Sequence, residues 1–196
     1  MVSLQNFLKG TILIQRLLLF CLFPIIALSH PHVFVDVGYD VKIKPNYTQI
    51  DISWTLDEMN SQMLLFDFGI FSGSDITQEK IDFIEKEYFS NLAKFDYYSF
   101  ISFNGKTIEI PPPTNFRVSV DDHKLSYHFT LKPKLDATYG ELKIGSFDAE
   151  NLLALDIISA KTNVSTTIEN MKIDQQIAFE NKDYFVVDVL IIRMNS

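Results

Sequence analysis

The chain has 196 residues with 17 basic and 25 acidic side chains, and its net charge is −8 at neutral pH. This acidic balance argues against nucleic acid as a partner, because phosphate backbones are bound mainly through Lys and Arg. The single cysteine, Cys21, lies near the N-terminus. The remainder of the chain therefore has no disulfide and no thiolate ligand, and any metal there must be held by nitrogen and oxygen.

Residues 1–29 have the layout of a cleavable export signal. Two basic residues precede an apolar run at 17–28, and small residues fit the positions before a cut between Ser29 and His30. The run is shorter than the roughly 20 residues that a membrane-spanning helix needs. We therefore expect a periplasmic protein that is not membrane-embedded after cleavage and consists of one domain, residues 30–196.

Alternating apolar and polar residues predict that most of this domain is β-strand. The alternation runs through 32–44 and returns at 50–56 after a turn at Pro45, which predicts an antiparallel hairpin. Residues 58–68 and 77–95 instead have helical spacing, with Thr77 as the expected N-cap. Further strands are predicted at 97–103, 107–110, 115–120, 125–131, 141–147, 152–158, 163–168 and 184–193.

Short strands separated by regular turn signals are typical of a β-sandwich. We predict a mainly β, immunoglobulin-like β-sandwich with an inserted helical segment at about 58–95. The sequence has no Gly-x-Ser-x-Gly elbow and no phosphate-binding glycine loop, so hydrolytic and phosphoryl-transfer chemistry have no support. We expect a protein that is not an enzyme; a copper oxygenase built on the N-terminal residues is the enzymatic alternative.

The new N-terminus is the strongest candidate for chemistry. Cleavage before His30 gives His30-Pro31-His32, with a free α-amine and two imidazoles that lose their protons near neutral pH. Pro31 lacks the amide proton that planar X-X-His chelates of copper or nickel must lose, so that motif is excluded. A chelate of the amine and ring of His30, joined by His32, resembles the histidine brace of some copper proteins. Nickel, cobalt, zinc and copper all suit such ligands.

Further ligands are less clearly indicated. His128 shares the polar face of its predicted strand with Ser126 and Thr130, so we expect it to be the third imidazole. Asp36 lies four residues after His32 on the same predicted strand face and is the first acidic candidate. The participation of His123, Asp57 and Glu58 stays open. Each of these side chains also has a simpler interpretation as a solvated, hydrogen-bonded or helix-capping group.

Four segments resemble the bacterial periplasmic family of domain of unknown function one thousand and seven. They are His30-Pro31-His32-Val33-Phe34-Val35-Asp36, Ser53-Trp54-Thr55-Leu56-Asp57-Glu58, Asn104-Gly105-Lys106 and Leu125-Ser126-Tyr127-His128-Phe129-Thr130-Leu131. The resemblance covers essentially the whole mature domain. Members of this family are often described as periplasmic components of ABC-type transport systems, associated with nickel, cobalt or zinc permeases.

The resemblance also implies site residues. It identifies His30, His32 and His128 as the matching histidines and adds Asp148, although Ala149 and Glu150 stand where the family usually has Pro and Thr. Relatives often carry a calcium-type loop of alternating carboxylates. The corresponding residues 67–73 lack those carboxylates, so we expect no calcium.

We therefore predict a periplasmic accessory protein that captures a divalent transition metal, nickel, cobalt, zinc or copper. The predicted metal ligands are His30, His32, His128, Asp36 and Asp148. The predicted partner is an inner-membrane metal transporter, with the direction of transport and the oligomeric state left open. The alternative is an immunoglobulin-like interaction module of a transport system that binds no metal.

Overall fold

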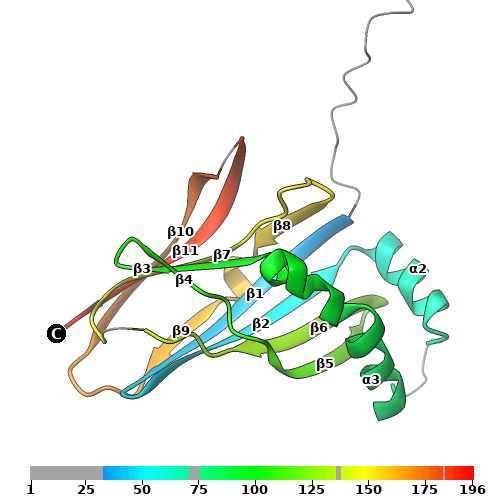
Figure 1. The fold of residues 1–196 in the computed structure, drawn as a ribbon, viewed down its shortest axis with the longest axis horizontal. Helices are drawn as coiled ribbons and strands as arrows, with labels where there is room; N and C mark the ends of the chain where they lie inside the picture. Colours follow the sequence, from blue (N-terminus) through cyan, green and yellow to red (C-terminus); the bar gives the residue numbers. More distant parts are fainter. Residues whose placement is uncertain (1–32, 71–75, 136–137, 183) are drawn as a thin grey trace, which may run out of the picture. The chain divides into compact units, whose positions relative to one another are not determined.

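Two β-sheets form the framework of the protein (Figure 1). The computed structural model describes residues 33–70, 76–135, 138–182 and 184–196. The predicted cleavage site, His30 and His32 therefore lie outside the described residues, as do residues 71–73 of the loop at which no calcium is expected. The two-sheet architecture confirms the prediction of a mainly β, sandwich-like fold.

Sheet A has the strand order β5-β6-β2-β1-β8, and β9 also pairs with β1. Its strands are β1 (Val33–Lys44), β2 (Tyr47–Leu56), β5 (Thr114–Asp121), β6 (Lys124–Leu131), β8 (Leu153–Ile157) and β9 (Asn163–Thr166). The predicted hairpin is present, because Lys44 pairs with Tyr47 across the two-residue turn. However, β8 and β9 run parallel to β1, which differs from the all-antiparallel sheets of immunoglobulin domains.

Sheet B has the strand order β10-β11-β7-β3-β4. Its strands are β3 (Ser99–Phe103), β4 (Lys106–Ile108), β7 (Gly140–Ser146), β10 (Lys172–Lys182) and β11 (Phe185–Asn195). Strand β10 was not predicted from the sequence. This strand lies at the edge of the sheet, and most of its side chains are polar.

The predicted helical segment follows β2. It contains α2 (Glu58–Asp67), α3 (Gln78–Glu87) and the 3-10 segment η1 (Phe89–Tyr98); a single 3-10 turn, η2 (Ser159–Lys161), follows β8. Ser61 attaches α2 to sheet A, since its hydroxyl donates to the Leu56 carbonyl and accepts the Leu125 amide proton. None of the described helices is long and apolar enough to cross a membrane.

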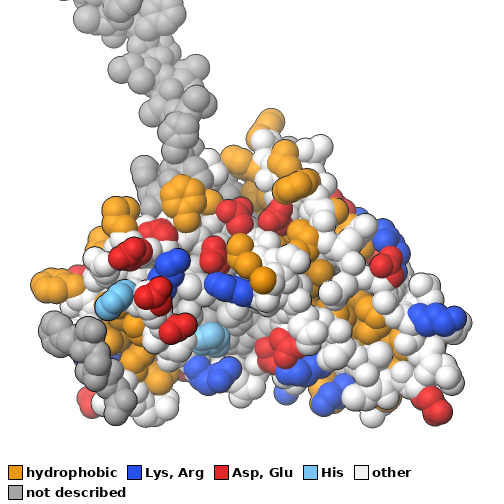
Figure 2. All heavy atoms as spheres, turned by 180° about the vertical axis from the view of Figure 1, so that it is seen from behind, with side chains coloured by type: hydrophobic (Ala, Val, Ile, Leu, Met, Phe, Trp, Pro, Cys, Tyr) orange, Lys and Arg blue, Asp and Glu red, His pale blue; other side chains and the backbone are white. Residues whose placement is uncertain are grey.

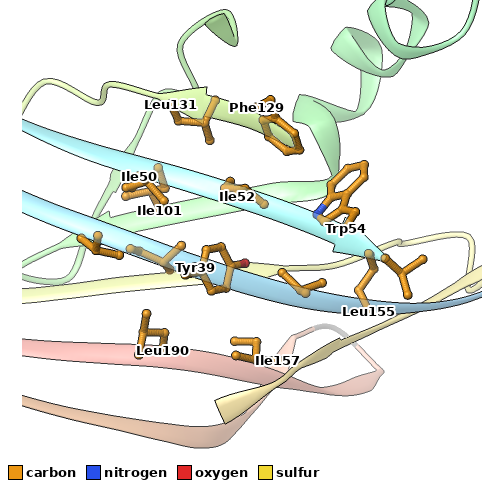
Figure 3. Close-up of a cluster of buried hydrophobic side chains, with 14 of the residues drawn as sticks. Tyr39, Ile50, Ile52, Trp54, Ile101, Phe129, Leu131, Leu155, Ile157 and Leu190 are labelled. Atoms are coloured by element: carbon orange, nitrogen blue, oxygen red, sulfur yellow. The ribbon is translucent and has the colours of Figure 1, made fainter. Parts of the chain in front are cut away.

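The core is the apolar layer between the two sheets. Alternate residues of β1, β2 and β6 point into it, and Figure 3 shows Tyr39, Ile52, Trp54 and Phe129 among them. The Tyr39 hydroxyl lies 2.9 Å from Ser146 Oγ, and burial raises the pKa of this phenol well above its usual value. The remaining residues of the same strands therefore face outward, where they form a polar surface on sheet A.

Gly38 allows η2 to pack closely against this outer face. A Cβ atom at position 38 would lie 2.6 Å from Ser53 Oγ and 2.8 Å from the Lys161 carbonyl oxygen. Such distances are shorter than van der Waals contact, so a side chain here would displace the backbone at Lys161. The glycine thereby keeps Lys161 next to the polar residues of β1.

Candidate metal centre at the start of the first strand

The first residues of β1 are held by hydrogen bonds on both sides. The Val33 amide donates to the Leu152 carbonyl at 3.2 Å, in the loop before β8. The Phe34 amide donates to Asp57 Oδ2 at 3.0 Å, and the Asp57 amide donates to the Phe34 carbonyl at 2.9 Å. The chain that directly follows His32 thus enters the sheet at a fixed point.

Asp57 is one of the two carboxylates that organise this point. It is the N-cap of α2, where Oδ1 accepts the Asn60 amide proton at 2.9 Å. Burial acts to raise the pKa of Asp57, but hydrogen bonds from the Asn60 and Phe34 amides outweigh it and the pKa lies below its usual value. Asp57 therefore stays ionised and places a negative charge beside the start of β1.

Asp148 is the second of these carboxylates, and it is buried, with 5% of its surface exposed. Oδ1 accepts the Glu150 amide proton, and Oδ2 accepts those of Leu152 and Leu153, each at 2.9 Å. These bonds shape the loop whose Leu152 carbonyl binds Val33. Asp148 thus positions the strand start through the loop, and both of its oxygens already bind backbone amides; its predicted role as a metal ligand stays a prediction.

Asp36 lies on the outer face of sheet A, three residues into β1. It is opposite Thr55 on β2 and Asp156 on β8, and its Oδ2 lies 3.1 Å from Lys161 Nζ. Burial, followed by the charges of Asp188 and Asp36, raises the pKa of Asp156. The two adjacent carboxylates therefore concentrate negative charge roughly 10 Å along the strand from Val33, at about 3.3 Å per residue.

His128 lies on the same face, in the row formed by Gly38, Ser53 and Arg117. Its Nε2 is 2.7 Å from Ser119 Oγ, and burial, with a smaller contribution from Arg117, lowers the pKa of the imidazole. The ring borders a groove of about 590 Å³. Figure 2 shows acidic, basic and histidine side chains interspersed on this side of the molecule.

The structure does not bring the predicted ligands within 33–196 together. His128 is two strands from β1 and five residues beyond Val33, which places its Cα roughly 20 Å from that of Val33 for the usual strand spacings. Asp148 lies in the loop after β7, whereas Asp36 and His128 lie on the outer face of sheet A. Across the described ranges, no group of three or more His, Cys, Asp or Glu residues could hold a metal ion.

The other candidates have separate positions. His123 is exposed in the turn between β5 and β6, at a positive φ of 62°. Two further carboxylates were not predicted: Asp156 lies in β8, and Asp188 lies in β11, where its Oδ2 accepts the Ile157 amide proton at 2.9 Å. A sequence signal existed for Asp188, since it is the one charged residue within the apolar stretch 185–192.

Comparison with known proteins identifies relatives for most of this chain. Residues 16–178 match the family described as Protein of unknown function (DUF1007). An uncharacterized protein of Haemophilus influenzae is 28% identical over 108 residues, which cover 54% of this chain and 50% of the relative. An uncharacterized 15.5 kDa protein in the trpE 3'region of Spirochaeta aurantia is 28% identical over 76 residues, 38% of this chain and 54% of the relative. The chain thus spans about half the length of these curated relatives, and by the extent of the family match it belongs to the DUF1007 family.

Proposed function

We propose that this protein is a periplasmic accessory that captures nickel, cobalt, zinc or copper through its processed N-terminus and serves an inner-membrane metal transporter. The observation that carries the proposal is the sequence His30-Pro31-His32, which cleavage would turn into one α-amine and two imidazoles. These groups are borderline nitrogen ligands that bind late first-row metals at neutral pH.

The anchoring of β1 supports this proposal. Val33 and Phe34 are fixed by the Leu152 carbonyl and by Asp57. A ligand-bearing segment attached to a fixed strand loses less conformational entropy on metal binding than one attached to a flexible chain. We therefore assign Asp148 and Asp57 the role of positioning residues for the histidines.

The electrostatics of this region also favour a cation. Asp57 is ionised at the strand start, and Asp36 and Asp156 face each other farther along β1 and β8. Asp36 is the better placed of the two predicted outer-face ligands, because His128 is roughly twice as far from Val33 along the sheet. The proposal consequently places the metal on His30 and His32, and Asp36, His128 and Asp148 remain ligands to be tested.

Isothermal titration of the mature protein with nickel, copper, cobalt and zinc tests metal capture. We expect at least one metal to bind with a Kd below about 10 µM, and we expect an added alanine before His30 to weaken binding at least about tenfold. His123→Ala is the matched histidine control and should leave the affinity unchanged. No binding of any of the four metals, or full binding by the extended variant, would reject the N-terminal site.

Mass spectrometry of the protein from the periplasmic fraction tests the processing step. The proposal requires a polypeptide that begins at His30. A start at any other residue would remove the amine-and-imidazole chelate, whatever metal the folded domain binds.

A further inference from the structure

Strand β8 leaves one edge of sheet A open. It ends the strand order of this sheet and pairs with β1 on one side. The Ile158 amide donates to Val37 and the Leu152 carbonyl accepts from Val33, so the even-numbered residues hydrogen-bond with β1. Because backbone groups alternate in direction along a strand, those of Leu153, Leu155 and Ile157 point to the open edge.

Two carboxylates occupy the ends of this edge. Asp148 accepts the Leu153 amide proton and Asp188 accepts the Ile157 amide proton, each at 2.9 Å. The Leu155 amide between them has no hydrogen-bond partner among the described residues. Among the described residues, the Leu155 amide is therefore the unpaired donor of this edge; Leu155 is 8% exposed and lies between the two segments that the aspartates fix.

A groove of about 280 Å³ separates this edge from the β10–β11 hairpin. The hairpin contributes Phe179 and Val186, whose surfaces are 78% and 67% exposed. In Figure 1 the ends of β10 and β11 extend beside β8. Large apolar side chains next to an open strand edge are the features of sites that bind an added β-strand.

The negative charge of the groove favours a basic occupant. Its ionisable lining residues are Asp148, Asp156 and Asp188, and no described Lys or Arg lines it. The like charges of Asp188 and Asp36 act on Asp156, so an added cation would be attracted there. Anionic lipid and a second copy of this acidic chain would both be repelled.

We propose that the open edge of β8 binds an extended segment of a partner protein with alternating apolar and basic side chains. The segment pairs with the Leu155 backbone, places apolar side chains against Phe179 and Val186, and directs a basic side chain to Asp156. The Leu152 carbonyl binds Val33, so the partner would lie beside the start of β1. This inference does not rest on metal binding.

Fluorescence anisotropy with a labelled ten-residue peptide of alternating Val and Lys, capped at both ends, tests the proposal on the mature protein. We expect saturable binding with a Kd of about 100 µM or tighter, and at least about tenfold weaker binding for Phe179→Glu. Phe66→Glu is the matched control, because Phe66 is 77% exposed on α2 and does not line the groove. It should leave the affinity within about twofold of wild type.

Peptide variants test the pairing mode without altering the fold. N-methylation of alternate residues removes the backbone donors along one edge of the peptide. Two such peptides are possible, one methylated at the odd positions and one at the even positions. Methylation of the edge that pairs with β8 should abolish binding, whereas methylation of the other edge should not. Replacing the Lys residues of the peptide by Glu should abolish binding. The Asp156→Asn variant of the protein should bind the Lys-containing peptide more weakly than the wild type does. Hydrogen exchange should show that the bound peptide protects the Leu155 amide.

Three outcomes would overturn the proposal. The first is no binding at about 1 mM peptide, beyond the weakest range expected for a specific strand site. The second is equal binding of both N-methylated peptides and of the unmodified peptide, which would exclude strand pairing. The third is a dimer of the protein alone that Phe179→Glu dissociates, which would make a second copy the occupant. None of these outcomes depends on metal affinity, so failure here and failure of metal capture are distinguishable.

Discussion

The aspartates around the start of β1 and those on the outer face of sheet A differ in what they bind. Asp57 and Asp148 accept hydrogen bonds from backbone amides of neighbouring segments. Asp40 and Asp51 instead pair with the side chain of Lys42, at 2.8 and 2.9 Å, on a solvent-facing surface. Asp57 and Asp148 therefore fix the path of the backbone, whereas Asp40 and Asp51 make side-chain contacts on the surface of sheet A.

This difference has an energetic basis. A buried donor that loses its acceptor costs its full desolvation energy, about 1–3 kcal/mol. An exposed ion pair that loses one member returns both groups to water and costs about 0–1 kcal/mol. Substitutions in the two regions should therefore differ severalfold in their effect on the free energy of unfolding.

Asp148→Ala should have the largest effect. It leaves the amides of Glu150, Leu152 and Leu153 without their acceptor, and we expect a loss of about 3–4 kcal/mol in the free energy of unfolding. Urea denaturation measures it. Glu150→Ala, an exposed change in the same loop, should cost less than about 0.5 kcal/mol. Equal urea midpoints for Asp148→Ala and Glu150→Ala would contradict the structural role of Asp148.

Asp57→Ala should rank second, with a loss of about 2 kcal/mol, because both the α2 cap and the bond to Phe34 disappear. At neutral pH, Asp57→Asn should recover only the part of this loss that comes from the α2 cap, because the Nδ2 of asparagine donates and cannot accept the Phe34 amide proton. The pKa of Asp57 is lower in the folded protein than in the unfolded chain. Its ionic contribution is therefore fully present above about pH 4 and is lost as the pH falls toward the folded pKa. The stability difference between wild type and Asp57→Asn should shrink in the same pH range.

The sequence predicted those elements whose side-chain pattern is set by burial. One face of β1 lies in the core, so its buried residues Val35, Val37 and Tyr39 alternate with Asp36 and Gly38. This alternation is the pattern from which the strand was predicted. Strand β10 was missed because it lies at the edge of sheet B. Only Ile173 and Ile177 of its larger apolar residues pack against the core, so no alternation is visible.

The candidate site was only partly predictable for a different reason. The outward orientation of His128 followed from strand alternation, and the structure places it on that polar face. The role of Asp148 depends on the path of a loop between two strands, and that of Asp188 on a contact between two sheets. No periodicity encodes such contacts, so these carboxylates can be assigned only in three dimensions.

His128 provides a smaller, pH-dependent test on the outer face. Burial and Arg117 lower its pKa in the folded state, so the unfolded chain binds the proton first as the pH falls. Stability should decrease as the pH is lowered through about 6.5 and should level off below the folded pKa. His128→Gln should flatten this part of a stability profile measured by urea denaturation, while the acidic region governed by Asp57 remains. A slope near pH 6.5 that survives the substitution would assign it to another group.

Asp36→Asn should have the smallest effect, because two contributions oppose each other. The change removes an exposed ion pair with Lys161, worth less than about 0.5 kcal/mol, and it also removes the charge that acts on Asp156. We expect a change in unfolding free energy near zero, while the pKa of Asp156, followed by NMR titration, moves toward its ordinary value. A loss above about 1 kcal/mol would place Asp36 with Asp57 and Asp148 as a structural carboxylate. Titration of the same variant with metal tests whether Asp36 is a metal ligand. If it is, the metal affinity of Asp36→Asn falls although its stability does not. An unchanged metal affinity would show that Asp36 does not join the histidines as a ligand.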